Sequence, residues 1–145
     1  MTASPIETRH RENLELVRRG FDAFAGGDME AVLAIADPEV EVYMPPTMPN
    51  GGTFHGHDGY RLWVERWLEA WGEFRIEVLD AAPIGRSHVI THAKQHGVGR
   101  GSGVRVEMEA WYVTEVRGGK FVSLHLYPSY AEALDVAERR ERAAE

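Results

Sequence analysis

Apolar residues recur with the period of a helix in the first part of the chain. The first stripe, with spacings of three and four, consists of Leu14, Val17, Phe21 and Phe24. This spacing predicts an amphipathic helix from about residue 11 to the glycine pair at 26–27. Asp28 is suited to cap a second helix, Met29 to Ala36, which the following Asp37-Pro38 pair ends.

A second and longer stripe gives the strongest helix prediction. Its apolar residues are Tyr60, Trp63, Val64, Trp67, Leu68 and Trp71. They follow the i, i+3, i+4, i+7 rule, with Asp58 as the N-cap and Gly72 at the end. A last helix is expected from the Ser129-x-x-Glu132 capping box to about Arg140.

Elsewhere the period is two, which predicts strands. The expected strands are residues 40–43, 74–79, 87–98, 103–116 and 120–127. Residues 44–52, with three prolines and two glycines, are expected to form an irregular loop. Helices in front and a meander behind predict an α+β fold, with helices packed on a strongly curved, mostly antiparallel sheet.

The chain is expected to form one domain. Residues 1–9 lack periodicity and are interpreted as a flexible arm, 10–140 as a single domain, and 141–145 as a frayed charged tail. A length of 145 residues suits one core and not two.

Composition and charge narrow the classes of partner. The net charge of −7 and the lack of a basic cluster argue against binding to nucleic acid or to an anionic membrane. The absence of cysteine excludes disulfides and thiol nucleophiles. No secretory leader and no apolar run of 18 residues is present, so a cytoplasmic location is expected.

Several segments together resemble one known family. They are Leu16–Phe24, Gly27–Ala31, Ala36–Val40, Phe54–Gly59, Gly119–Val122 and Ala131–Leu134. In order and spacing they resemble the SnoaL-like branch of the nuclear transport factor 2 superfamily, which includes ketosteroid isomerases, limonene-epoxide hydrolases and polyketide cyclases. The resemblance implies a cone-shaped α+β fold, usually a homodimer, with an apolar pocket and no cofactor.

The chain departs from this family where its enzymes carry catalytic carboxylates. The isomerases place an aspartate near the first strand, where this chain has Tyr43 and Met44. Their second acid aligns near Trp111. The Trp-x-Asp pattern of hydrolases and cyclases is replaced by Leu124-His125-Leu126. The resemblance therefore implies the fold without fixing a reaction.

Two other residues are candidates for acid–base chemistry. Glu109 shares a strand side with Trp111, so it is a candidate pocket acid, and His92 is a candidate base or hydrogen-bond donor. The alternative is that these strand residues face solvent or a dimer contact. A slip of one residue in the strand would exchange the two faces.

Histidine spacing gives no metal site. His88, His92 and His96 are four residues apart, which in a strand separates them by about 13 Å, too far to share one ion. His55 and His57 are near enough in an extended segment to chelate, but they are interpreted as a loop feature at the entrance of the tryptophan helix.

The expected pocket is mainly aromatic. Its candidate lining residues are Tyr43, His55, Trp63, Trp67, Trp111, Leu126 and Tyr127. One hypothesis is an isomerase, cyclase or hydrolase acting on a compact apolar substrate, with Glu109 or His92 as base. The alternatives are a non-catalytic binder of an apolar ligand and a dimeric interaction module.

Overall fold

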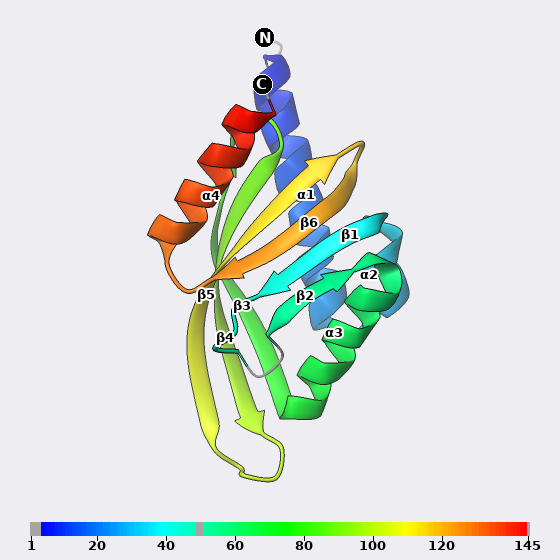
Figure 1. Cartoon of the computed structure of the whole chain (residues 1–145), viewed down its shortest axis with the longest axis vertical. Coiled ribbons are helices and arrows are strands. Elements are labelled where there is room, and N and C mark those ends of the chain that lie inside the picture. Colours follow the sequence, from blue (N-terminus) through cyan, green and yellow to red (C-terminus); the bar gives the residue numbers. More distant parts are fainter. Residues whose placement is uncertain (1–3, 49–50, 145) are drawn as a thin grey trace.

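A computed structural model describes residues 4–48 and 51–144. The described chain forms four helices and a six-stranded open sheet (Figure 1). The helices are α1 (Pro5–Ala25), α2 (Met29–Ala34), α3 (Gly56–Ala70) and α4 (Tyr130–Ala143). The strands are β1 (Ala36–Met44), β2 (Gly52–His55), β3 (Trp71–Ile84), β4 (His88–Gly99), β5 (Arg105–Arg117) and β6 (Lys120–Tyr127). The predicted α+β class is confirmed.

The sheet order is β2-β1-β6-β5-β4-β3. Only the β1–β6 pair is parallel, since every other described neighbour pair is antiparallel. The register shifts within the long β3–β4 pair, between Trp71 and Glu73 and again between Val78 and Asp80. Such bulges bend strands and increase their twist, which gives the sheet its curvature.

The two faces of this sheet are covered by different helices. On β4, Val89 packs with α1 residues in one core cluster, whereas Ile90 packs with Ala133 and Ala137 of α4 in another. Because successive strand residues point to opposite faces, α1 and α4 lie on opposite sides of the sheet (Figure 1). We call the side covered by α1 and α3 the inner face and the side covered by α4 the outer face.

The ends of the chain are more ordered than the sequence suggested. Residues 5–9, expected in a flexible arm, form the first turns of α1, because the Ser4 side chain accepts a hydrogen bond from the Glu7 N–H. Pro5 suits the first helical turn, where its missing N–H costs nothing. Residues 1–3 of that expected arm lie outside the described residues.

The expected frayed tail is helical through Ala143, and α4 is anchored by Glu141. The Glu141 carboxylate accepts hydrogen bonds from the backbone N–H groups of Arg86 and Ser87 and contacts the His88 imidazole. Asn13 of α1 donates to the Arg86 carbonyl on the same β3–β4 turn. Both terminal helices are therefore tied to one turn. Residue 145 lies outside the described residues.

Three other boundaries differ from expectation. The expected loop 44–52 has its first residue in β1 and its last in β2, whose Phe54 pairs with Val42 of β1, and its residues 49 and 50 lie outside the described residues. The first strand begins at Ala36 rather than at residue 40, with a register irregularity across the segment that contains Pro38. α3 begins at Gly56 with His55 as its N-cap, so Asp58 lies in its first turn.

Candidate functional site

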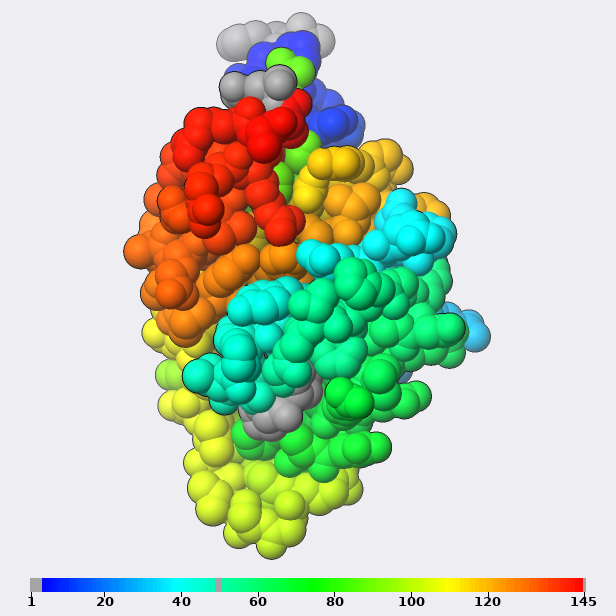
Figure 2. Space-filling view, viewed as in Figure 1, coloured from blue at the N-terminus to red at the C-terminus, as the bar shows by residue number. Residues whose placement is uncertain are grey.

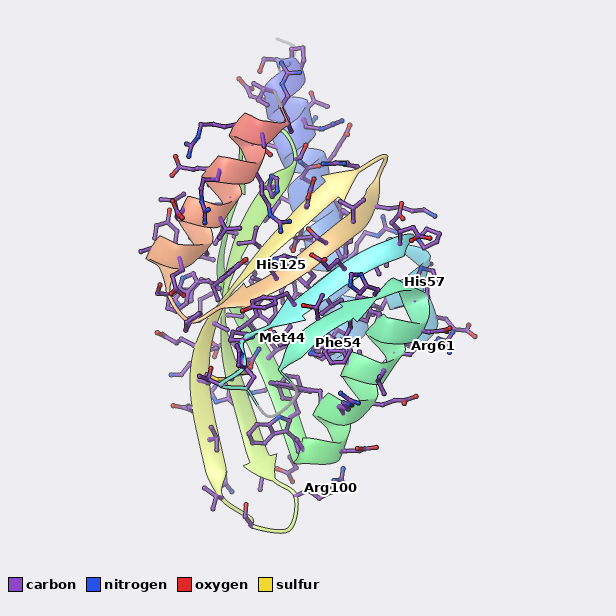
Figure 3. All side chains as sticks on the ribbon, in the orientation of Figure 1. Met44, Phe54, His57, Arg61, Arg100 and His125 are labelled. Atoms are coloured by element: carbon purple, nitrogen blue, oxygen red, sulfur yellow. The ribbon has the colours of Figure 1, made fainter. Side chains whose placement is uncertain are left out.

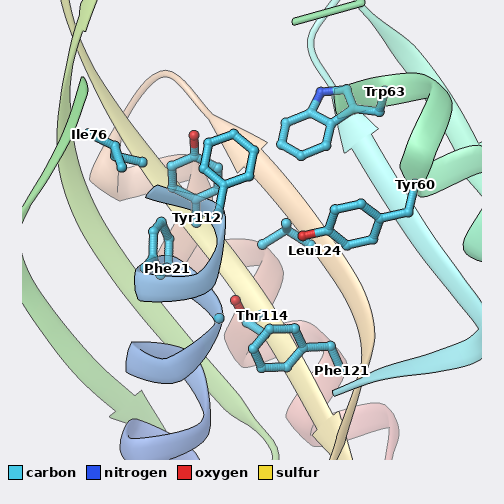
Figure 4. A pocket seen from close by; sticks show the side chains of 10 residues that line it. Phe21, Tyr60, Trp63, Ile76, Tyr112, Thr114, Phe121 and Leu124 are labelled. Carbon is cyan, nitrogen blue, oxygen red and sulfur yellow. The ribbon is translucent and has the colours of Figure 1, made fainter. Parts of the chain in front are cut away.

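A small cavity lies on the inner face, between the end of α1, the start of α3 and the sheet (Figure 4). Its volume is about 30 Å³. The lining residues are Gly20, Phe21, Phe24, Tyr60, Trp63, Ile76, Tyr112, Thr114, Phe121 and Leu124. Since a water molecule needs about 10–15 Å³ of such space, the cavity has room for about two waters.

The sequence periodicities bring these side chains together. Phe21 and Phe24 are three residues apart on α1, and Tyr60 and Trp63 are three apart on α3, so each pair shares a helix face. Phe24 stacks on Trp63 with ring centroids 5.7 Å apart. Phe21 packs edge-on against Tyr112 at 5.2 Å. The two helices thus close the cone with aromatic rings.

The polar side-chain groups of the lining are the hydroxyls of Tyr60, Tyr112 and Thr114 and the indole N–H of Trp63. Figure 4 shows the Tyr60 and Thr114 hydroxyls turned toward the space between the rings. Within the described residues, Thr114 Oγ1 has no hydrogen-bond partner. The Tyr112 hydroxyl is engaged by the side-chain amide of Gln95. Burial raises the pKa of both Tyr60 and Tyr112, so each phenol keeps its proton at neutral pH.

Among the described lining residues there is no carboxylate, imidazole or amine. The site can therefore hold an apolar group and hydrogen-bond to one or two polar atoms. Protonated phenols donate hydrogen bonds well, but at neutral pH they are poor bases.

Only one of the sequence-predicted pocket residues, Trp63, lines this cavity. Trp67 is fully buried beside it and packs on Trp71 and Phe74, with ring centroids 5.8 and 5.1 Å away. Leu126 is buried in the same core cluster as Trp63. Both support the wall of the cavity without forming its surface.

His55 and His57 lie apart from the cavity. His55 is an exposed N-cap residue of α3 whose side chain makes no capping bond. The His57 ring lies 2.9 Å from the Ala36 carbonyl, so it ties the start of α3 to β1 (Figure 3). Among the described residues, no three histidine or acidic side chains are grouped so as to hold a metal ion.

The structure places Glu109, His92 and Trp111 on the outer face, away from the cavity. The inner residues of β5 are Ala110 and Tyr112, which belong to the main core. Alternation therefore turns Glu109 and Trp111 outward. His92 stacks flat on Trp111, and its Nε2 lies 3.6 Å from Glu109 Oε1. Glu109 shares a strand side with Trp111 as expected, but that side faces away from the cavity.

Tyr43 and Tyr127 also lie on the outer face, where they share a second cleft with His125. The volume of this cleft is about 430 Å³. Its lining residues are Tyr43, His125, Tyr127, Val136, Arg139, Arg140 and Ala143. Figure 3 shows His125 on β6 between α4 and β1.

Sequence reasoning missed His125 as a site residue. A signal was present in the alternation of β6, where Ser123, His125 and Tyr127 form a polar row opposite the apolar Leu124 and Leu126. On a strand of a covered sheet, a row of polar side chains indicates a face that packs against charged side chains.

Comparison with known proteins identifies the family. The SnoaL-like domain profile matches residues 17–124. No curated protein sequence matches the chain. No described helix is long and apolar enough to span a membrane.

Similar solved structures share the fold. Bal32a, from a soil-derived mobile gene cassette, is 24% identical with a TM-score of 0.76, covering 90% of this chain and 99% of that one. TerC, co-crystallised with polyporic acid, is 20% identical with a TM-score of 0.74, covering 88% and 98%. A Catenulispora acidiphila protein with a ketosteroid isomerase-like fold, in complex with trimethylamine, is 19% identical with a TM-score of 0.69, covering 83% and 90%.

Proposed function

We propose a function for this chain, which belongs to the SnoaL-like family. Its inner cavity binds a small, mainly apolar molecule carrying one hydrogen-bonding group. The observation that carries this proposal is the lining: six aromatic residues surround a space whose polar groups are three hydroxyls and one indole N–H. Aromatic walls with a few placed polar groups are typical of small-molecule sites.

The lining favours binding over acid–base catalysis. An isomerase, cyclase or hydrolase of the expected kind needs a group that exchanges a proton near neutral pH beside its substrate. The described lining residues offer only phenols, whose pKa burial raises, and an aliphatic hydroxyl. Glu109 and His92 lie on the other face of the sheet, so we do not assign them to this site.

The size of the cavity limits its occupant. With about 30 Å³ available, only a molecule of a few heavy atoms enters without movement of the walls. The trimethylamine held by the Catenulispora acidiphila relative is of this size class. Aromatic rings attract a small alkylammonium through cation–π interaction and a neutral ketone through dispersion. A larger ligand must displace Phe21 or Phe24, which are only half-buried.

The test is an NMR titration with trimethylamine and with acetone, following the Trp63 indole N–H. Thr114→Val removes the unpartnered hydroxyl at nearly constant volume. It is expected to weaken the binding of acetone about fivefold, the effect of one neutral hydrogen bond. Thr91→Val is the matched control, because Thr91 is equally buried and unpartnered but lies outside the lining. Unshifted cavity resonances with both probes, or equal effects of the two variants, would contradict the proposal.

We also propose that a second copy of the chain binds to the outer face beyond α4. There Lys94 Nζ and His96 Nδ1 of β4 lie 3.6 and 3.0 Å from the Glu107 carboxylate of β5, and His92 Nε2 lies 3.6 Å from that of Glu109. In an isologous interface these pairs face the same pairs of the second copy across the twofold axis, so each glutamate can also contact Lys94 or a histidine of the other copy. Light scattering during gel filtration is expected to give twice the mass of 16.3 kDa and the single mass for Glu107→Lys/Glu109→Lys. A monomeric parent chain contradicts this assembly.

A further inference from the structure

The cleft between α4 and the outer face, which we call the outer cleft, is separate from the inner cavity. Its floor is formed by rings from two neighbouring strands. Tyr43 of β1 and His125 of β6 are register partners, with ring centroids 5.5 Å apart. Tyr127 lies 6.0 Å from Tyr43 and 6.2 Å from His125. These spacings give an aromatic floor at which a flat ring can pack.

The hydrogen-bond partners of His125 determine which of its ring nitrogens carries the proton. His125 Nε2 lies 2.8 Å from Glu41 Oε2, and a carboxylate only accepts, so Nε2 carries the proton. Nδ1 faces the Tyr127 hydroxyl at 3.1 Å and an Arg140 N–H at 3.5 Å, both able to donate. Burial and the Arg140 guanidinium lower the pKa of His125. The imidazole is therefore neutral at neutral pH, and the floor carries no cation.

The positive charges of the cleft come from its wall. Arg139 and Arg140 project from α4, and Val136 and Ala143 fill the space between the turns. Arg140 is committed to the sheet, because its Nη1 lies 3.3 Å from Ser123 Oγ and 3.6 Å from Glu115 Oε1.

Arg139 is the more available of the two cations. Its described ion pair is with Asp135 at 2.9 Å, and both side chains are more than three-fifths exposed. Such an exposed pair contributes little, and a guanidinium has five N–H donors, so Arg139 can bind a second anion.

An aromatic floor of neutral groups beside an accessible guanidinium suits one class of ligand. We propose that the outer cleft binds a planar aromatic carboxylate, with its ring against Tyr43 and Tyr127 and its carboxylate on Arg139. The cleft, about 430 Å³ in volume, accommodates two fused rings. Figure 2 shows the surface of β6 (orange) reaching the exterior between α4 and β1 (cyan), so the site opens to solvent.

The test is calorimetric titration with 2-naphthoate and its neutral analogue 2-naphthamide. The parent chain is expected to bind the carboxylate about tenfold more tightly, the contribution of a charge-assisted contact. Arg139→Gln is expected to remove this difference. Arg142→Gln, on an exposed residue of the same helix outside the cleft, is the matched control and leaves it intact. Asp135→Asn frees Arg139 and is expected to tighten naphthoate two- to threefold.

Two further variants distinguish the two sites. Tyr43→Leu is expected to weaken both probes, because it removes a ring from the floor. Thr114→Val in the inner cavity is expected to change neither. Failure to bind naphthoate, equal binding of the two probes, or sensitivity to Thr114→Val with indifference to Arg139→Gln overturns the outer site. None of these results depends on whether the inner cavity binds its own ligand.

Discussion

His125 Nε2 lies 2.8 Å from Glu41 Oε2, and this contact joins β6 to β1 across the parallel pair of the sheet. The two residues are 84 positions apart in the sequence. Both lie at the outer face, where the row of polar side chains on β6 meets α4. Because Arg140 of α4 lies beside His125, the charge on this helix acts on the contact between the two strands.

The first prediction is a pH dependence of stability from His125. Burial and then Arg140 lower its pKa in the folded chain below the ordinary value of 6.5, although Glu41 raises it in part. Between the folded pKa and 6.5 the unfolded chain binds more protons. The contribution of His125 to stability is therefore complete above pH 6.5 and decreases as the pH falls through this window.

Two substitutions are expected to shift this titration in opposite directions. Arg140→Gln removes a neighbouring cation and raises the pKa of His125, whereas Glu41→Gln removes an anion and lowers it further. NMR titration of the His125 ring protons measures both changes. Shifts of the same sign in the two variants would contradict the arrangement.

The second prediction concerns Glu141, whose carboxylate joins α4 to the β3–β4 turn. Burial alone would raise the pKa of its carboxyl, but hydrogen bonds with His88 and with the Arg86 and Ser87 N–H groups outweigh burial and lower the pKa. The stabilisation is therefore present above the ordinary pKa of 4.5 and lost as the pH falls through the lower folded value. Glu141→Gln is expected to move the acid-unfolding midpoint to higher pH. Glu138→Gln, on an exposed residue of the same helix, is expected to leave it in place.

The third prediction concerns the close approach of α1 to β6. A Cβ added at Gly20 would lie 2.6 Å from the Phe121 ring. Gly20→Ala is therefore expected to destabilise the fold by about 1–3 kcal/mol, as overpacking does, despite the better helix propensity of alanine. Gly26→Ala is the control, because the nearest atom there is 3.4 Å away. Urea unfolding compares the two variants, and equal stabilities would show that Phe121 moves aside freely.

Local patterns in the sequence predict most of the elements. The stripes at 14–24 and 60–67 are the faces of α1 and α3, and the alternating segments are the long strands. The helix predicted from the second stripe is one residue too long, since Trp71 begins β3, and Leu68 of its stripe is exposed. The start of α1 was missed although Ser4-x-x-Glu7 repeats the capping-box pattern seen at Ser129, since no apolar period accompanies it before Leu14. β2 was missed because four residues after a proline- and glycine-rich run show no period.

The site was harder to predict because alternation shows which residues share a face, not which face is inner. Trp111 was assigned to the pocket because it aligns near the second pocket acid of the isomerases that the chain resembles, but the inner aromatic residue of β5 is its neighbour Tyr112. Trp111 shares its side with Glu107, Glu109 and Glu115, and this acidic row was the available sign of the outer face. The His92–Trp111 stack, with ring planes 3° apart, then follows from the strand register.

The last prediction is that Phe24 controls the size of the inner cavity. Phe24 stacks on Trp63 and meets Phe74 edge-on at 5.8 Å, and it is only half-buried at the end of α1. Phe24→Ala is expected to cost about 2–3 kcal/mol of stability, the lower part of the range for large-to-small core changes. It is also expected to let benzene or indole bind, measured by NMR and by the rise in thermal midpoint on adding ligand. Phe74→Ala removes a ring that contacts Phe24 but does not line the cavity, so a comparable loss of stability without binding is expected. Binding of benzene to both variants alike would show that the lining does not select the occupant.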